Sequence, residues 1–175
     1  TTNMASLIEK LLFIARGDSN TQKIEKKNLW INELIDEVVI ESKLIAHDRI
    51  ISSNKNDAIT AFADYKMLKQ MLRIFVDNSI KFTSKQGKID ISSILIDNTI
   101  EITVSDTGIG IPSDEIKNIF DRFYCVSKSR SKEYSGSGLG LSIAKWIVDM
   151  HFGTINVESV EGRGTKIVVR LKDRK

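Results

Sequence analysis

Glycine residues gather in three clusters in the second half of the chain. The clusters are Gly108 with Gly110, Gly136 with Gly138 and Gly140, and Gly162 with Gly164. Each lies at a predicted strand end or just before a predicted helix, where a missing side chain lets backbone approach a ligand closely. For any one cluster alone, a tight turn is the alternative. Two familiar phosphate loops are excluded, because the chain contains no G-x-x-x-x-G-K-[ST] and no G-x-G-x-x-G sequence.

Asp106 ends a predicted strand and directly precedes the first glycine cluster. A carboxylate below a glycine loop can accept a hydrogen bond from an amine, such as the amino group of adenine. Taken alone, an aspartate at this position more often caps its own turn. An aspartic protease would need two such carboxylates and therefore a dimer of this chain.

Asn78 and Lys81 are three residues apart in a predicted helix and so share a face. Asparagine offers a neutral oxygen to Mg²⁺, and lysine offers a point charge to phosphate. Taken in isolation, such a pair is more often part of a solvated polar stripe.

The segment Gly138-Leu139-Gly140 precedes a predicted helix, whose free N–H groups and dipole favour a phosphate. A glycine hinge without a ligand is the alternative. The loop before it carries more cations than acids, which suits a polyphosphate, although solvated loop charge is the commoner meaning. These charged residues are Arg122, Lys128, Arg130 and Lys132 against Asp121 and Glu133.

Hydrophobic periodicity predicts the elements that position these residues. Helices are predicted at 4–15, from about 31 to 42, at 64–82 and at 139–151, with Gly153 as a cap and a short helix after Pro112. Strands are predicted at 23–29, 50–51, 58–62, 88–96, 99–105, 154–159 and 165–171, and a mobile loop at 124–137. Adjacent strands without an intervening helix predict an α+β fold. It would be a two-layer α/β sandwich with a mixed, mostly antiparallel sheet and helices packed on one face.

Composition narrows the class of protein. A chain of 175 residues with 41% hydrophobic and 28% charged residues is enough for one globular domain of ordinary size. The net charge of +3 is small and scattered, so it gives no argument for nucleic acid. The single Cys125 excludes a disulfide framework. No apolar run is long enough for a bilayer, so we expect a soluble domain from a reducing compartment.

Five motifs in one order resemble the boxes of the sensor histidine kinases, in the GHKL ATPase and kinase superfamily. Residues 77–83 resemble the N box, 106–112 the G1 box, 119–124 the F box, 136–143 the G2 box and 162–165 the closing glycine motif. The resemblance covers about residues 21–172. It implies a catalytic ATP-binding domain at 21–175, preceded at 1–20 by a linker and the end of the second helix of the dimerisation domain.

The resemblance implies roles for the candidate residues. Asn78 would bind Mg²⁺, Lys81 would contact phosphate, and Asp106 would hold the adenine amino group. The other residues implied to contact nucleotide are Phe82, Gly108, Gly110, Ile111, Arg130, Gly136, Gly138, Leu139, Gly140 and Thr165. The cofactors implied are ATP and Mg²⁺, and no catalytic residue is assigned within the chain.

Three positions depart from the pattern. Ile74 stands where the family usually has a second asparagine. The same position resembles that of a glutamate base in gyrase-type ATPases and anti-sigma-factor kinases, where the base activates water or a serine. Isoleucine cannot accept a proton, so that route to hydrolysis is missing. Phe82 replaces a frequent tyrosine. His47 precedes Asp48 as a phosphoacceptor would, but it lies inside the ATP-binding region, so we expect the acceptor histidine upstream of residue 1 and a structural role for His151.

The implied function is to bind Mg-ATP and donate the γ-phosphate to a histidine of the upstream dimerisation domain, for relay to the receiver domain of a response regulator. The alternative is a regulatory module that senses ATP without phosphorylating anything. We expect a monomeric fragment of a homodimeric protein, with no nucleic-acid partner. We also expect a cytoplasmic domain of a membrane-anchored protein.

Overall fold

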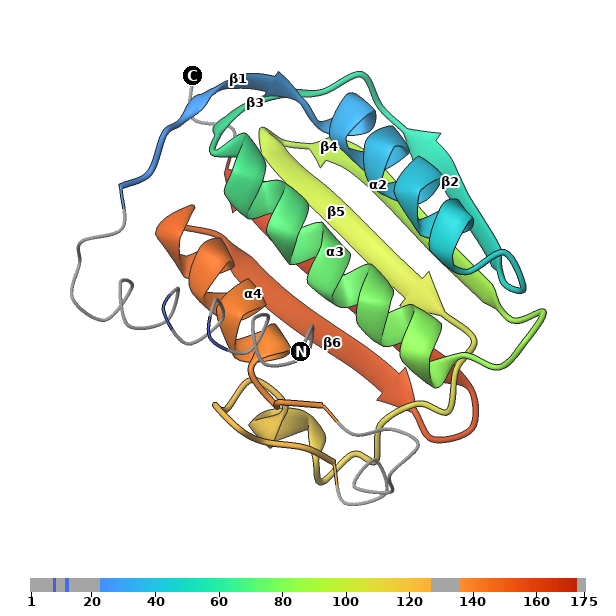
Figure 1. Ribbon diagram of the computed structural model, residues 1–175. Coiled ribbons are helices and arrows are strands. Elements are labelled where there is room, and N and C mark those ends of the chain that lie inside the picture. The colour runs from blue at the N-terminus through green and yellow to red at the C-terminus, as the bar shows by residue number, and fades with distance from the viewer. Residues whose placement is uncertain (1–7, 9–11, 13–22, 127–135, 173–175) are drawn as a thin grey trace.

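The larger sheet has five strands in the order β2-β4-β5-β7-β6. The computed structural model describes residues 8, 12, 23–126 and 136–172 (Figure 1). The strands are β2 (Ile50–Asn56), β4 (Lys88–Ile96), β5 (Thr99–Asp106), β6 (Thr154–Val160) and β7 (Gly164–Lys172). Only β2 and β4 pair in parallel, and the other neighbours are antiparallel. The predicted mixed, mostly antiparallel sheet is confirmed.

A second, two-stranded sheet joins β1 (Lys27–Trp30) to β3 (Thr60–Ala63) in antiparallel register. The strands predicted at 50–51 and 58–62 therefore exist, but they belong to different sheets. The first of them is also longer than predicted and reaches Asn56.

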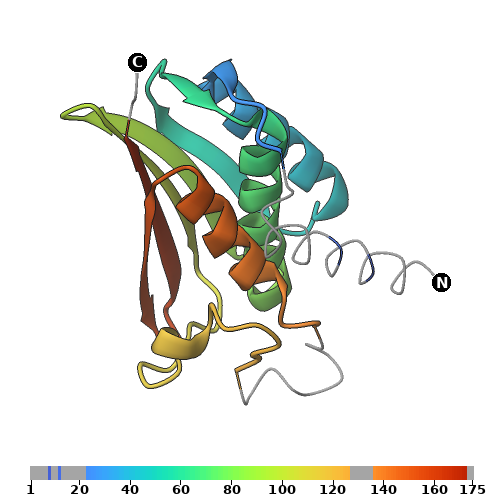
Figure 2. The same cartoon turned by 90° about the vertical axis from the view of Figure 1, so that its left-hand side faces the viewer.

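Three helices cover one face of the large sheet, as predicted (Figures 1 and 2). They are α2 (Ile31–Ile45), α3 (Tyr65–Phe82) and α4 (Gly140–Met150), with α3 lying between the other two. The core forms where Phe75 of α3 meets strand residues such as Ile91 and Ile102, all of them almost completely buried. Burial of this apolar layer holds the helices on the sheet.

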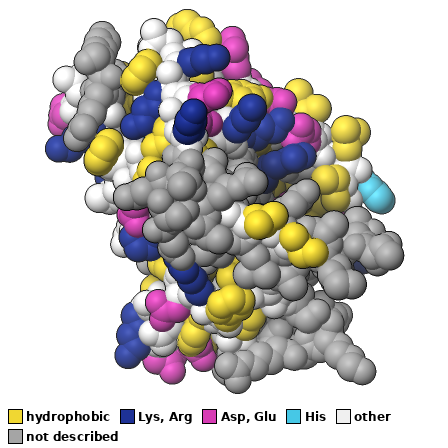
Figure 3. Space-filling model, turned by 60° about the vertical axis from the view of Figure 1, so that its left-hand side comes forward, with side chains coloured by type: hydrophobic (Ala, Val, Ile, Leu, Met, Phe, Trp, Pro, Cys, Tyr) yellow, Lys and Arg dark blue, Asp and Glu magenta, His cyan; other side chains and the backbone are white. Residues whose placement is uncertain are grey.

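Charged side chains link α2 to α3 across the outer surface of the helical layer. Lys69 Nζ lies 2.5 Å from Glu37 Oε1 and 2.9 Å from Glu41 Oε1, and Arg73 Nη2 lies 2.7 Å from Glu41 Oε2. Basic and acidic side chains are interspersed on the face shown in Figure 3. No helix in the described ranges is long and apolar enough to cross a membrane.

The ends of α3 and α4 farthest from the glycine clusters are joined by buried hydrogen bonds. Asp64 caps α3 by accepting from Met67 N at 3.1 Å, and its own backbone N–H donates to His151 Nε2 at 3.1 Å. His151 Nδ1 lies 2.8 Å from Ile147 O and serves as its donor. Burial lowers the pKa of His151, so the ring is neutral, in agreement with its expected structural role.

Several predicted boundaries need correction. The residue that leaves α4 in the left-handed conformation is Phe152 (φ 56°), not Gly153. Gly153 N donates to Val148 O at 2.9 Å, as the second residue beyond a helix does in a Schellman motif. The helix predicted after Pro112 is a single 3₁₀ turn, η1 (Ile116–Asn118). The predicted helix at 4–15 and the loop at 124–137 lie largely outside the described residues.

Candidate nucleotide site

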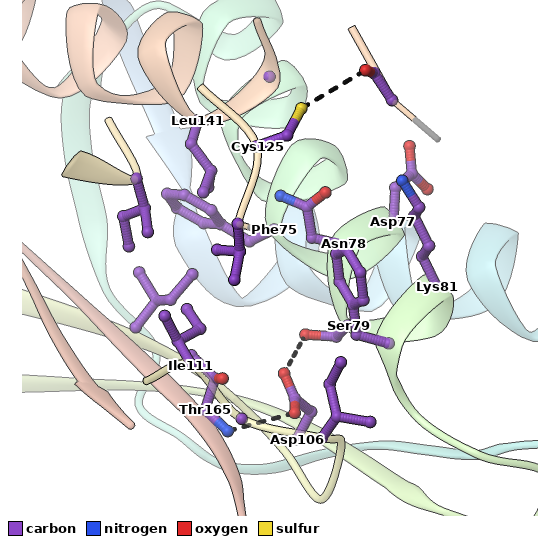
Figure 4. A pocket seen from close by; sticks show the side chains of 18 of the residues that line it. Phe75, Asp77, Asn78, Ser79, Lys81, Asp106, Ile111, Cys125, Leu141 and Thr165 are labelled. Carbon is purple, nitrogen blue, oxygen red and sulfur yellow. Dashed lines mark hydrogen bonds between the residues drawn. The ribbon is translucent and has the colours of Figure 1, made fainter. Parts of the chain in front are cut away.

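A cavity of about 350 Å³ opens between the C-terminal half of α3, the end of β5 and the segment that leads into α4. This volume is within the range of small-molecule sites. Figure 4 shows Asp106, Ser79 and Thr165 at one end of the cavity, with Asp77 and Lys81 toward the other. Most of the site residues predicted from the sequence line this cavity. They are Asn78, Lys81, Phe82, Asp106, Gly110, Ile111, Gly136, Gly138, Gly140 and Thr165.

Asp106 caps its own turn, as one of the two alternatives expected, and it also lines the cavity. Its Oδ1 accepts from Gly108 N at 2.9 Å and from Thr165 N at 3.2 Å. Its Oδ2 accepts from Ser79 Oγ at 2.8 Å. A carboxylate can accept about four hydrogen bonds. The three donors among the described residues therefore leave room on Oδ2 for one donor from a ligand.

Two of the glycines that line the cavity are required by neighbouring backbone. Gly110 has φ +69°, and a Cβ added there would lie 2.1 Å from Val160 O. Gly138 has φ +67°, and its added Cβ would lie 2.5 Å from the carbonyl carbon of Phe123. Both positions exclude a side chain whether or not a ligand is bound. Close approach to a ligand is therefore not the only reason for these glycines.

The last turns of α3 present polar groups to the other end of the cavity. Asn78 and Lys81 both line it, which confirms that they share a face. Lys81 Nζ lies 5.0 Å from the centre of the Phe82 ring. It is also 3.0 Å from the position that a Cβ on Gly136 would occupy. The ammonium group is thus held where α3 faces the glycine segment.

The N-terminus of α4 lies directly against the cavity. Its N-cap residue, Leu139, makes no side-chain capping hydrogen bond, and Gly140 lines the cavity. The first N–H groups of a helix lack intrahelical acceptors and attract anions. Leu139 itself is completely buried in the core. It can contribute to a site only through its backbone, while its side chain anchors the segment.

Three predicted site residues are not among the lining residues. Gly108 lies behind Asp106 and acts through its N–H. Leu139 is in the core, and Arg130 lies outside the described residues. Sequence reasoning missed Ser79 and Cys125, which both line the cavity. Ser79 is a polar residue in the buried stripe of α3, after Leu72 and Phe75, and that interruption was the available signal.

Comparisons with known proteins agree on one family. Residues 63–175 match the family described as histidine kinase-, DNA gyrase B-, and HSP90-like ATPase. The sensor histidine kinase RppB of Synechocystis sp. is 32% identical over 171 residues, covering 96% of this chain and 38% of that protein. The sensor protein CiaH of Streptococcus pneumoniae is 35% identical over 171 residues, covering 97% of this chain and 38% of that protein. The chain thus spans well under half of either relative.

Solved structures give the same result. The mycobacterial sensor histidine kinase MprB superposes with a TM-score of 0.77 at 27% identity, over 85% of this chain and 99% of that one. Full-length ShkA, in complex with AMPPNP, gives 0.85 at 26% identity, over 96% of this chain and 35% of that one. The family match covers well over half of the chain. The chain belongs to the family of histidine kinase-, DNA gyrase B- and HSP90-like ATPases.

Proposed function

We propose that the chain is the ATP-binding catalytic domain of a two-component sensor histidine kinase. In the whole protein it would donate the γ-phosphate of ATP to a histidine of an upstream dimerisation domain. The observation that carries this proposal is the distribution of groups in one cavity. An acceptor for an amine, Asp106, lies at one end, and Lys81 with the uncapped start of α4 lies toward the other. A nucleotide has a base amine and phosphates at its opposite ends.

The donor set also fits Mg²⁺, with Asn78 as its side-chain ligand. Mg²⁺ keeps several waters and binds substrate phosphates, so it needs few protein oxygens. Among the described residues, no three His, Cys, Asp or Glu side chains group as a metal site, which such an ion does not require. When bound, Mg²⁺ would neutralise charge on the phosphates.

The residues of the chain would act by positioning. Lys81 and the first N–H groups of α4 would hold the phosphates, and Asp106 would fix the base. Beside the start of α4, Ile74 Cγ2 lies 3.3 Å from the position of a Cβ on Gly140. An apolar side chain there cannot activate water, which favours transfer to an acceptor over hydrolysis.

The relatives support the wider proposal. RppB, WalK and CiaH are named as sensor kinases or sensor proteins, and ShkA was crystallised with AMPPNP. We propose by analogy that residues 1–20 end a dimerisation helix and that residues 21–175 are the catalytic domain. The whole protein would be a membrane-anchored homodimer with the domain in the cytoplasm, and its phosphoryl group would pass to a response regulator.

Asn78→Ala tests the proposal in the longer protein that includes the dimerisation segment. We expect nucleotide binding without metal to persist, because Asp106 is intact, and labelling from γ-³²P-ATP to be nearly abolished. Asn156→Ala, on an exposed position of β6, is the matched control and should label like wild type. If Asn78→Ala labels at the wild-type rate, the assignment of the metal ligand is wrong.

The same assay separates the second candidate function. A regulatory module would bind Mg-ATP through the same cavity but transfer no phosphate. Wild-type protein that binds nucleotide and stays unlabelled would therefore favour that module.

A further inference from the structure

We propose, on the basis of the nucleotide site proposed above, that Ser159 of β6 is a positioning residue for the end of the cavity that would receive the base. Its hydroxyl group joins the segment after β5 to the β6–β7 hairpin. It thereby fixes Ile111 and Thr165, which line the cavity on the side where Asp106 lies (Figure 4). Ser159 is not among the lining residues, so it acts only through these neighbours.

Three hydrogen bonds meet at the hydroxyl group of Ser159. Ile111 N donates to Oγ at 2.8 Å, Oγ donates to Gly164 O at 2.9 Å, and Thr165 Oγ1 lies 2.9 Å from Oγ. A hydroxyl group has one proton to donate and two acceptor positions. With its proton on Gly164 O, Ser159 can accept from both Ile111 N and the hydroxyl group of Thr165. All three hydrogen bonds can therefore exist together.

The hydrogen bond from Ile111 N restrains a segment that has few other restraints. It is the one hydrogen bond that Ile111 makes within the described part of the chain. Ile109 is held separately, because Gly162 N donates to Ile109 O at 2.7 Å. However, Gly110 lies between them, and glycine backbone rotates freely. Loss of the Ser159 hydroxyl group would thus let Ile111 leave the cavity wall while Ile109 stays in place.

On the other side of the hydroxyl group, Thr165 continues the connection to Asp106. The backbone N–H of Thr165 donates to Asp106 Oδ1 at 3.2 Å. A chain of hydrogen bonds therefore runs from Ile111 through Ser159 and Thr165 to Asp106. Every member of this chain except Ser159 lines the cavity. The hydroxyl group thus sets the spacing of groups that a bound base would contact.

The size of the effect follows from how often the wall keeps its shape before a ligand binds. When only a fraction of the free protein has the binding-competent arrangement, the affinity falls by that fraction. Loss of one hydrogen bond changes such a population by about fivefold to tenfold. Ser159→Ala removes one atom from an edge strand, so the sheet should persist. The phosphate end, with Lys81 and the start of α4, should be unaffected.

The experiment is calorimetry with ADP on the 175-residue chain without metal, together with urea unfolding. Ser159→Ala should lower the affinity for ADP about fivefold to tenfold, whereas Ser159→Thr, which keeps the hydroxyl group, should stay within about twofold of wild type. Ser52→Ala is the matched control. Ser52 is also half-buried on an edge strand, β2, and its hydroxyl group donates to Asp90 Oδ1 at 2.9 Å. This variant loses a hydrogen bond but should keep the wild-type affinity.

Four results would overturn the inference. An unchanged affinity in Ser159→Ala would show that Ile111 and Thr165 keep their places without the hydroxyl group. Equal losses in Ser159→Ala and Ser159→Thr would show that the hydroxyl group is not what matters. An equal loss in Ser52→Ala would make the effect one of general stability. Wild type that binds no ADP would overturn the proposed nucleotide site itself, which the other three results leave intact.

Discussion

Asp106→Asn should replace the hydrogen-bond acceptor that the cavity offers to a ligand with a donor, because the structure determines which way the new amide points. The carbonyl oxygen of asparagine must take the place of Oδ1, where Gly108 N and Thr165 N donate. The flipped amide would set its NH₂ group against these two N–H donors. That orientation loses two hydrogen bonds of about 1 kcal/mol each and leaves two donors unsatisfied. The NH₂ group therefore replaces Oδ2 and faces the ligand as a donor.

The size of the effect follows from that orientation. A hydrogen bond to a charged group contributes about 1.5–3 kcal/mol, so affinity for ADP should fall roughly 10- to 150-fold. Inosine diphosphate, which has a carbonyl where adenine has its amine, should bind the variant more tightly than it binds wild type. Stability should change little, because Ser79 Oγ can accept from the new amide as readily as it donated to the carboxylate.

Calorimetry with both diphosphates, together with thermal unfolding, measures these quantities. Asp57→Asn is a suitable control, because Asp57 Oδ2 accepts from Leu95 N at 3.0 Å outside the cavity. A variant at position 106 that keeps its ADP affinity within about threefold and gains nothing for inosine diphosphate would refute the amine-reading role.

Two further predictions concern stability. Gly138→Ala should destabilise the fold by about 1–3 kcal/mol and weaken nucleotide binding. The control is Gly162→Ala, at φ +78° with nothing within 4 Å of its added Cβ, which should cost only the backbone strain. Equal unfolding midpoints for the two variants would argue against the contact of residue 138 with Phe123. The second prediction follows from the lowered pKa of His151: only the unfolded state takes up a proton as the pH falls below about 6.5, so the free energy of unfolding should decrease there. Urea unfolding at about pH 7.5 and 5.5 tests this, and His151→Gln should lose less stability between them than wild type does.

Local patterns predicted most of the fold, because most elements are specified by nearby residues. The helix at Tyr65–Phe82 has its aspartate cap and its apolar stripe in the sequence, and the β4–β5 hairpin has Asp97-Asn98, both at positive φ. The parallel pairing of β2 with β4 has no such local signal, since it depends on contacts between segments 38 residues apart, such as Ile51 with Ile89. The cap of α4 was predicted wrongly for the same reason. Gly153 was expected to be the left-handed residue, but its glycine is needed because it lies against β7, where an added Cβ would be 2.6 Å from Arg170 O. No sequence pattern shows that neighbour, so the left-handed conformation of Phe152 could not be predicted.

In the candidate site, too, some residues could be predicted from local patterns and others depend on contacts between distant segments. Asp106 and the glycines could be found because their spacing along the chain is distinctive. Ser79 could not be assigned to Asp106, because the two are 27 residues apart and meet only when α3 packs on β5. The reason for a glycine at position 110 could not be predicted either, since the backbone that excludes a side chain there belongs to residue 160.

The hydrogen bonds at the far ends of α3 and α4 give the helical layer unequal stiffness. There, Asp64 and His151 are joined through buried atoms whose rupture would leave polar groups without solvent. At the cavity end, α4 begins at Gly140, and no capping side chain ties its first turn. The helices α3 and α4 are thus held together by hydrogen bonds at the end formed by Asp64 and His151, whereas their spacing at the cavity end can adjust. Thermal motion should be smallest around residue 64 and larger in the backbone at the start of α4, where the buried side chain of Leu139 provides the anchor in place of a capping hydrogen bond.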